Sequence, residues 1–353
     1  MATNLFGLFL AALLLLSPND GQAAKGDHQQ AQMDLAATAA PANVAPPTAE
    51  SGPKRHKHLP APPGAIPLGW GLGIVFCPVV DLFTKRRYRD VRIVTAWRSG
   101  LGFIAESWRN LPGPMLLNEL GLMCAGAVVF QPGFISAILV LVGAVAGSLG
   151  GWLTITAGYR LALKHPDLPP APAWRLKFGR PERRWLVAMV VAGFVLFGAF
   201  LVSRLSVDIL SAVYRLIASA YLSHGRPLPG TGPDLVYPHY VLVGAASVMV
   251  SVALSPIWPM AMLSDKWKLK EVFKLTSGRW FPIALSMAPL YVLTFVSQLL
   301  THWAVTLAHA EKGVGQGWGI AVALLTTPTL YLAYIPFAVG VSAERYRQLT
   351  EAN

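Results

Sequence analysis

Long apolar runs separated by short basic loops constrain most strongly how this 353-residue chain can fold. Hydrophobic residues make up 54% of the chain and charged residues only 13%, about half the charged share of soluble domains. Each run is roughly as long as a helix that crosses a bilayer. The sequence therefore predicts an all-α transmembrane bundle of about seven spans, at residues 66–84, 115–132, 134–159, 185–203, 237–263, 281–303 and 318–342.

The distribution of Lys and Arg predicts the orientation of this bundle. Of the 29 Lys and Arg residues, 21 fall in four segments on one side of the predicted spans: 85–113, 160–184, 264–280 and 343–353. Short cytoplasmic loops are enriched in Lys and Arg, so we expect a cytoplasmic C-terminus and an external N-terminal tail in a bacterial inner membrane. This pattern accounts for the net charge of +12 without nucleic-acid binding.

The first 64 residues differ in composition from the rest of the chain. Residues 1–24 contain a short apolar core followed by small residues, which is typical of a signal peptide; an uncleaved N-terminal anchor is the alternative. Residues 25–64 are rich in Ala, Pro and His and show no apolar periodicity, which predicts a disordered external linker. The helical membrane domain then covers residues 65–353.

Two basic amphipathic segments, 91–111 and 266–280, each precede a pair of apolar runs. At helical spacing their apolar residues share one face: Val94, Trp97, Leu101, Ile104, Trp108 and Leu111 in the first, and Leu269, Val272, Phe273, Thr276 and Trp280 in the second. Basic residues lie largely off these faces, as in helices that rest on an anionic cytoplasmic leaflet. The predicted lipid-surface residues are Arg92, Arg98, Arg109, Lys266, Lys268, Lys270 and Lys274.

The two segments also share the order acidic, aromatic, basic, in Glu106-Ser-Trp108-Arg109 and Glu271-Val-Phe273-Lys274, which suggests a two-fold internal repeat. In GLGFIAESWRNLPGPMLL and LKEVFKLTSGRWFPIALS, the pattern resembles a broad bacterial group of six-helix membrane proteins. That group includes the YciC-like proteins and the membrane domain attached to some glycerophosphodiester phosphodiesterases. The resemblance covers about 91–345, implies a helical membrane architecture and carries over no catalytic residue.

Polar residues within apolar segments are functional candidates because they are costly to place in lipid. Glu119, in the second predicted span, could couple proton or ion movement, or could pair with Arg109 or reach the headgroups. Asp208 and Arg215 fall seven residues apart in 205–223, which we expect to be an interfacial or bundle-lining helix rather than a full span.

Two smaller features lie in other predicted spans. Asp81 near the end of the first span is expected to pair with Lys85 or Arg86 at the interface. In the third span, Gly143-x-x-x-Gly147 predicts close helix packing, because small residues allow backbones to approach.

Histidines on the predicted external side form the one candidate metal set: His224, His239, His302 and His309. Imidazoles suit zinc or copper, but the spacing matches no preformed site, so interfacial histidines bound to water or headgroups are the favoured interpretation. Neither Cys77 nor Cys124 belongs to a metal or redox motif. We predict no cofactor.

The sequence favours a non-enzymatic accessory or scaffold protein that organises partners or shapes the membrane through its amphipathic helices. Its partners would be the anionic leaflet and either other membrane proteins or further copies of itself. No nucleophile elbow, Walker loop or zinc-protease motif occurs in the chain. The alternatives are a small-molecule or ion transporter that uses the intramembrane polar residues, and an intramembrane lipid-modifying enzyme with His302 or His309 as base.

Overall fold

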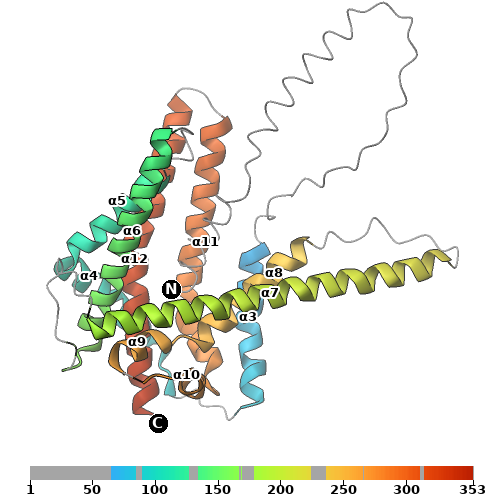
Figure 1. The fold of residues 1–353 in the computed structure, drawn as a ribbon, viewed down its shortest axis with the longest axis horizontal. Coiled ribbons are helices and arrows are strands. Elements are labelled where there is room, and N and C mark those ends of the chain that lie inside the picture. Colours follow the sequence, from blue (N-terminus) through green and yellow to red (C-terminus); the bar gives the residue numbers. More distant parts are fainter. Residues whose placement is uncertain are drawn as a thin grey trace, which may run out of the picture. The chain divides into compact units, whose positions relative to one another are not determined.

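The computed structural model describes residues 65–84, 90–126, 134–166, 168, 179–223, 236–264, 266–310 and 314–352. Within these ranges the chain forms helices and no strand, so the all-α prediction is confirmed (Figure 1). The helices are α3 (Ala65–Leu82), α4 (Ile93–Asn110), α5 (Pro112–Gly126), α6 (Phe134–Leu163), α7 (Arg180–Ser223), α8 (Val236–Ala253), α9 (Ile257–Leu263), α10 (Leu269–Thr276), α11 (Trp280–Ala310) and α12 (Val314–Glu351). The predicted signal peptide and linker lie outside the described residues.

Five helical stretches among the described residues are long and apolar enough to cross a membrane. They are Ala65–Leu82, Ile138–Leu163, Arg180–Ile209, Tyr240–Leu263 and Trp280–Ala304. Each coincides with a predicted span, which supports the membrane prediction. The other two predicted spans correspond to α5 and α12. The described part of α5 is 15 residues long, or about 22 Å, shorter than a hydrocarbon core of about 30 Å.

Two helical hairpins form the centre of the fold. Helices α5 and α6 pack closely against each other, and α11 and α12 lie side by side (Figure 1). The amphipathic helix α4 directly precedes the first pair, and α10 directly precedes the second. The order of an amphipathic helix followed by a hairpin thus occurs twice, as the sequence predicts, while the internal repeat itself stays a prediction.

Glycine pairs bring helix backbones into direct contact at three crossings. A Cβ atom added to Gly121 of α5 would lie 2.1 Å from the backbone nitrogen of Gly147 in α6. The same closeness occurs between α3 and α8 at Gly69 and Gly244, and between α4 and α12 at Gly100 and Gly340. The sequence prediction that Gly147 serves helix packing is therefore confirmed.

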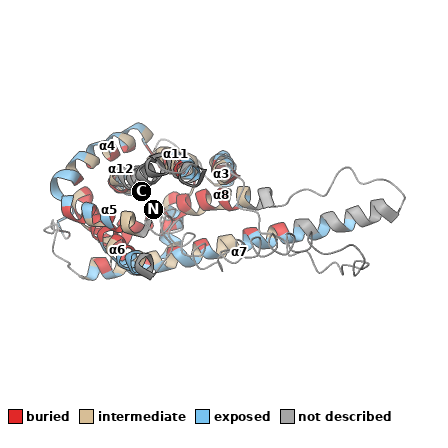
Figure 2. Ribbon diagram, turned by 90° about the horizontal axis from the view of Figure 1, so that it is seen from above, coloured by how far each residue is buried: buried red, intermediate tan, exposed pale blue. Residues whose placement is uncertain are grey.

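Helix α7 is much longer than the span predicted at 185–203. It continues for 44 residues without a break, so residues 205–223 belong to the same helix as that span. Neither Gly nor Pro occurs between residues 199 and 223 to interrupt it. In addition, α7 runs crosswise to α11 and α12, which Figure 2 views nearly end-on while α7 lies along its length.

One face of α7 explains its position. Trp185, Ala188, Ala192 and Leu196 recur at helical spacing and are buried against α8 and α9. The indole of Trp185 packs on that of Trp258 in α9, with ring centroids 5.5 Å apart. This contact belongs to the larger of two apolar clusters, which also includes side chains of α4, α6 and α12. The smaller cluster joins α3, α8 and α11.

Candidate functional site

The amphipathic helix α4 presents two different faces. Its buried face consists mainly of small residues, Ala96, Gly100 and Ser107, which pack on α12 together with Phe103. The sequence did not indicate this face, because it contains a single large apolar side chain. Small residues allow the two backbones to approach, so α4 is held by the protein itself rather than by the membrane alone.

An apolar edge of α4 is exposed beside basic residues. Val94, Leu101 and Trp108 are 57%, 61% and 38% exposed and recur every seven residues along the helix. Arg98 and Arg109 are exposed on the adjacent strip of the same helix. An exposed apolar strip flanked by arginines is the arrangement expected of a helix at a membrane surface.

The predicted apolar stripe of α4 is only partly correct. Trp97 and Ile104 are half-buried against the core, and Leu111 is buried. The indole N–H of Trp97 donates to the backbone carbonyl of Ser286 in α11 at 3.2 Å. These three residues therefore attach α4 to the protein and are not available to lipid.

Helix α10 repeats the arrangement on a smaller scale. Val272 and Thr276 are buried, whereas Phe273, which we predicted to share their face, is 43% exposed between Lys270 and Lys274. Phe273 lies at the edge of the buried face, so its ring can be reached from outside. Lys266 and Lys268, just before the helix, are also exposed.

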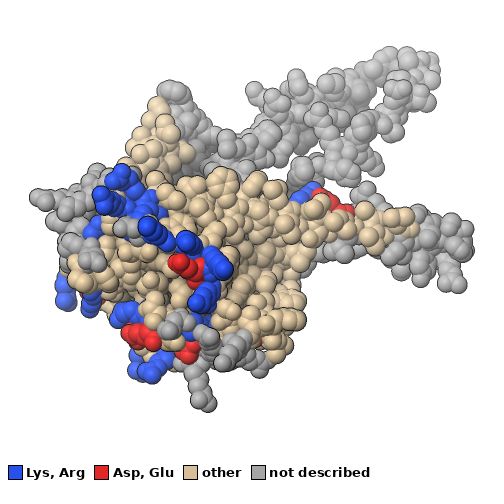
Figure 3. Space-filling model, turned by 60° about the horizontal axis from the view of Figure 1, so that its bottom comes forward, with Lys and Arg blue, Asp and Glu red and all other residues tan. Residues whose placement is uncertain are grey.

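We define the basic collar as the exposed residues Arg92, Arg98, Arg109, Lys266, Lys268, Lys270 and Lys274. On the face that Figure 3 presents, Lys and Arg side chains gather at one end of the described chain, beside a broad surface without charge. All seven predicted lipid-surface residues are thus accessible.

Buried polar contacts join the two parts of the basic collar. The chain turns between α10 and α11 at Gly278, whose φ is 76°, and the next residue, Arg279, is fully buried. The Arg279 guanidinium donates to Asp90, just before α4, through Nε at 2.8 Å and Nη2 at 2.6 Å. The start of α4 and the end of α10 are therefore held together.

A second acidic residue reaches the same turn. Asp81, at the end of α3, is fully buried and accepts hydrogen bonds from the backbone N–H groups of Trp280 and Phe281 at 3.0 and 2.9 Å. It therefore caps the N-terminus of α11, where a negative charge is favourable. The predicted partners Lys85 and Arg86 lie outside the described residues.

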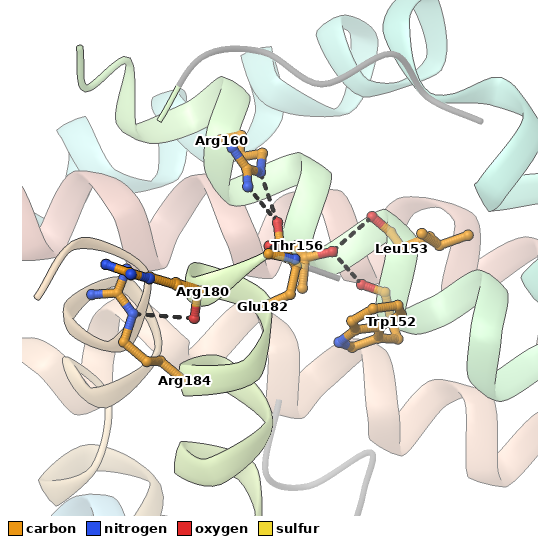
Figure 4. A network of polar contacts seen from close by, with 8 residues as sticks. Trp152, Leu153, Thr156, Arg160, Arg180, Glu182 and Arg184 are labelled. Atoms are coloured by element: carbon orange, nitrogen blue, oxygen red, sulfur yellow. Dashed lines mark hydrogen bonds and ion pairs between the residues drawn. The ribbon is translucent and has the colours of Figure 1, made fainter. Parts of the chain in front are cut away.

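A buried ion pair forms the corner between α6 and α7 (Figure 4). The Nε of Arg160, near the end of α6, donates to Glu182 in the first turn of α7 at 2.9 Å, and both side chains are buried. The other carboxylate oxygen accepts from the backbone N–H of Gly179. Next to this corner, an open groove is lined by Arg180, Arg183, Arg184, Val187 and Trp267. The three arginines of this groove therefore lie close to Lys266 and Lys268, the basic collar residues on either side of Trp267.

No family model, curated protein or solved structure matches this chain. The resemblance to the YciC-like group therefore stays a prediction.

Glu119 is buried in α5 and is only 5% exposed. Its Oε1 accepts from the side-chain amide of Asn118 at 3.4 Å, while its Oε2 is buried with no hydrogen-bond partner in the described part of the chain. Arg109 is exposed, so the predicted Glu119–Arg109 pair does not form. A charged carboxylate is costly to bury without a partner.

The remaining transport and metal candidates do not assemble into one site. Asp208 is exposed and lies 3.5 Å from Arg204 on the same helix, whereas Glu119 is buried in α5. The side chain of Arg215 lies outside the described residues. Of the four candidate histidines, the structure describes the side chain of His302 alone, and it is exposed. Among the described residues, no three His, Cys, Asp or Glu side chains are placed to hold a metal ion.

Proposed function

We propose that this chain is a non-enzymatic membrane protein of the accessory or scaffold type, which binds the anionic leaflet through the basic collar. In this proposal the cytoplasmic leaflet of a bacterial inner membrane supplies the lipid. The C-terminus and basic collar lie on the cytoplasmic side, and the N-terminal tail is external. Partner proteins or further copies of the chain would bind to this protein, while the basic collar holds it at the leaflet.

The observation that carries the proposal is the exposed apolar edge of α4 beside Arg98 and Arg109. A soluble surface gains nothing from exposing Val94, Leu101 and Trp108 in a row, whereas a membrane interface buries them. Each Lys or Arg near an anionic surface adds about 1 kcal/mol of attraction. The collar has seven such residues, so the electrostatic contribution is substantial even after screening by salt.

The apolar edge is tested by spin labels in the full-length protein reconstituted into vesicles, with Cys77→Ser and Cys124→Ser removing the native thiols. A label at Leu101→Cys should collide with oxygen, which partitions into lipid. A label at Thr95→Cys, an exposed residue about 100° around the helix from Val94, should collide instead with a water-soluble nickel chelate. Equal contact of both labels with the nickel chelate would contradict the proposal.

The charges are tested by lipid selectivity, measured as the relative association of spin-labelled phosphatidylglycerol and phosphatidylcholine with the protein. Combined Lys270→Glu and Lys274→Glu should lower the preference for phosphatidylglycerol at least about fivefold, since 1 kcal/mol corresponds to a factor of about five. Arg204→Glu, an exposed residue outside the collar, should leave it unchanged. An unchanged preference in the collar variant would exclude lipid binding by α10.

A transporter is the second candidate, and Glu119 is the observation that favours it. A buried carboxyl oxygen without a partner is a possible proton-carrying group in a membrane protein. Asp208 is exposed on α7 whereas Glu119 is buried in α5, which argues against a shared ion pathway between them. Glu119→Gln would abolish proton-coupled uptake under this second candidate and would leave lipid selectivity intact under the first.

A further inference from the structure

Three arginines are buried within the described part of the chain, and two of them have a carboxylate partner. Arg160 pairs with Glu182, and Arg279 pairs with Asp90. Arg345 of α12 is the third and is 4% exposed. Its Nε and Nη1 are buried and have no hydrogen-bond partner among the described residues.

The guanidinium of Arg345 is expected to be charged in this position. Burial lowers its pKa to about 10, which still leaves it protonated at neutral pH. The acidic groups that act on it are the phenols of Tyr159 and Tyr291, which are neutral at pH 7 and cannot balance its charge. A buried cation without a counter-charge is strongly destabilising, and among the described residues no carboxylate forms an ion pair with Arg345.

A small cavity adjoins this guanidinium. It has a volume of about 20 Å³ and lies where the turn after α8 meets α9, α11 and α12. Its polar lining comes from Arg345 and the side chains of Ser251, Ser255 and Ser342, and its apolar lining includes Trp258 and Leu290. Arginine N–H groups and serine hydroxyls can all donate hydrogen bonds, and no carboxylate of the described residues lines the cavity.

We propose that this cavity binds one small anion of chloride size through Arg345, with the serine hydroxyls as further donors. The cavity exceeds the minimum volume for one water molecule by only a small factor, which suits a monoatomic anion better than a large organic one. A water molecule could accept the same hydrogen bonds but would leave the charge unbalanced. The site involves none of the basic collar residues, so it is independent of the proposed lipid contact.

The test compares thermal unfolding of the purified full-length protein in sodium chloride and in sodium gluconate at equal ionic strength. A ligand that binds the folded state raises the Tm in a saturable way, and we expect a rise of about 5 °C at saturating chloride. Arg345→Gln should abolish the rise. Arg347→Gln provides the matched control, because Arg347 is exposed two residues further along the same helix and already pairs with Glu344.

Two further measurements keep the proposal testable if Arg345→Gln does not fold. Ser342→Ala should reduce the rise in Tm caused by chloride while Arg345 stays in place. In addition, the chloride NMR line should broaden in the presence of the unaltered protein, and it should sharpen when excess bromide displaces the bound chloride. Equal Tm values of the unaltered protein in chloride and gluconate would overturn the proposal. Stabilisation by phosphate but not by chloride would overturn the assignment of a chloride-sized anion.

Discussion

The buried carboxylate of Asp81 accepts a hydrogen bond from the backbone N–H of Trp280, 199 positions later in the chain. A cap is usually supplied by the residue just before the helix, but here Arg279 occupies that position. Arg279 instead turns inward to Asp90. The start of α11 is therefore fixed by two acidic residues from the first described segments of the chain.

Removing this cap should destabilise the fold. Asp81→Ala leaves two N–H groups at the start of α11 without their acceptor, and we expect a loss of about 2–4 kcal/mol, seen as a lower Tm in detergent. Asp81→Asn should lose less, because the amide oxygen still accepts. Asp208→Ala, at an exposed acid, is the control, and a Tm drop as large as that of Asp81→Ala would argue against a specific capping role.

The pair Arg279–Asp90 should show strong energetic coupling. Asp90→Asn removes the carboxylate charge that lies 2.6 Å from the fully buried Arg279, at an expected cost of about 3 kcal/mol. Combining Asp90→Asn with Arg279→Met should cost less than the sum of the two single changes. A double-mutant cycle on thermal unfolding measures this, and additive effects would show that the two residues do not depend on each other.

The crossing of α5 and α6 should not tolerate a methyl group. Gly121→Ala places its Cβ against the backbone of α6, so we expect a loss of about 3 kcal/mol. Gly102→Ala is the matched control, since no atom lies within 4 Å of its Cβ position in α4. That change should stabilise the protein by about 0.5–1 kcal/mol, because alanine loses less conformational freedom in a helix. Equal effects of both substitutions on the Tm would contradict the backbone contact.

Replacing Glu119 tests whether its carboxyl group has a structural or a functional role. Glu119→Gln retains an oxygen that can accept from Asn118 and removes a buried group that can carry charge. If the chain is an accessory protein, the variant should melt at the same or a higher temperature and keep its lipid selectivity. A marked loss of stability at neutral pH would show instead that the carboxylate has an ionic partner.

Much of the helical organisation could be predicted because apolar runs and basic loops are local properties of the sequence. The five apolar stretches and both amphipathic helices occur where hydrophobic periodicity indicates them. The division of the α4 apolar stripe, with Leu101 exposed and Leu111 buried, could not be predicted in the same way. It depends on which neighbouring helix covers each face, and α4 turns its small residues inward.

Long-range polar pairs escaped prediction for a related reason. Asp90 and Arg279 are 189 residues apart, and each lies in a basic segment of the sequence. The charge pattern therefore indicated solvent or lipid headgroups as their surroundings. The sequence offered one usable signal at this turn, Gly278, whose positive φ directs Arg279 back toward the core.

The three glycine crossings also determine which parts of the molecule can move against each other. Helices whose backbones touch cannot slide without separating, so α3 with α8, α4 with α12, and α5 with α6 should each shift as a rigid body. Any change of shape is then confined to the connections between these pairs. A partner that displaces α4 would therefore displace α12 as well, including the segment that contains Arg345.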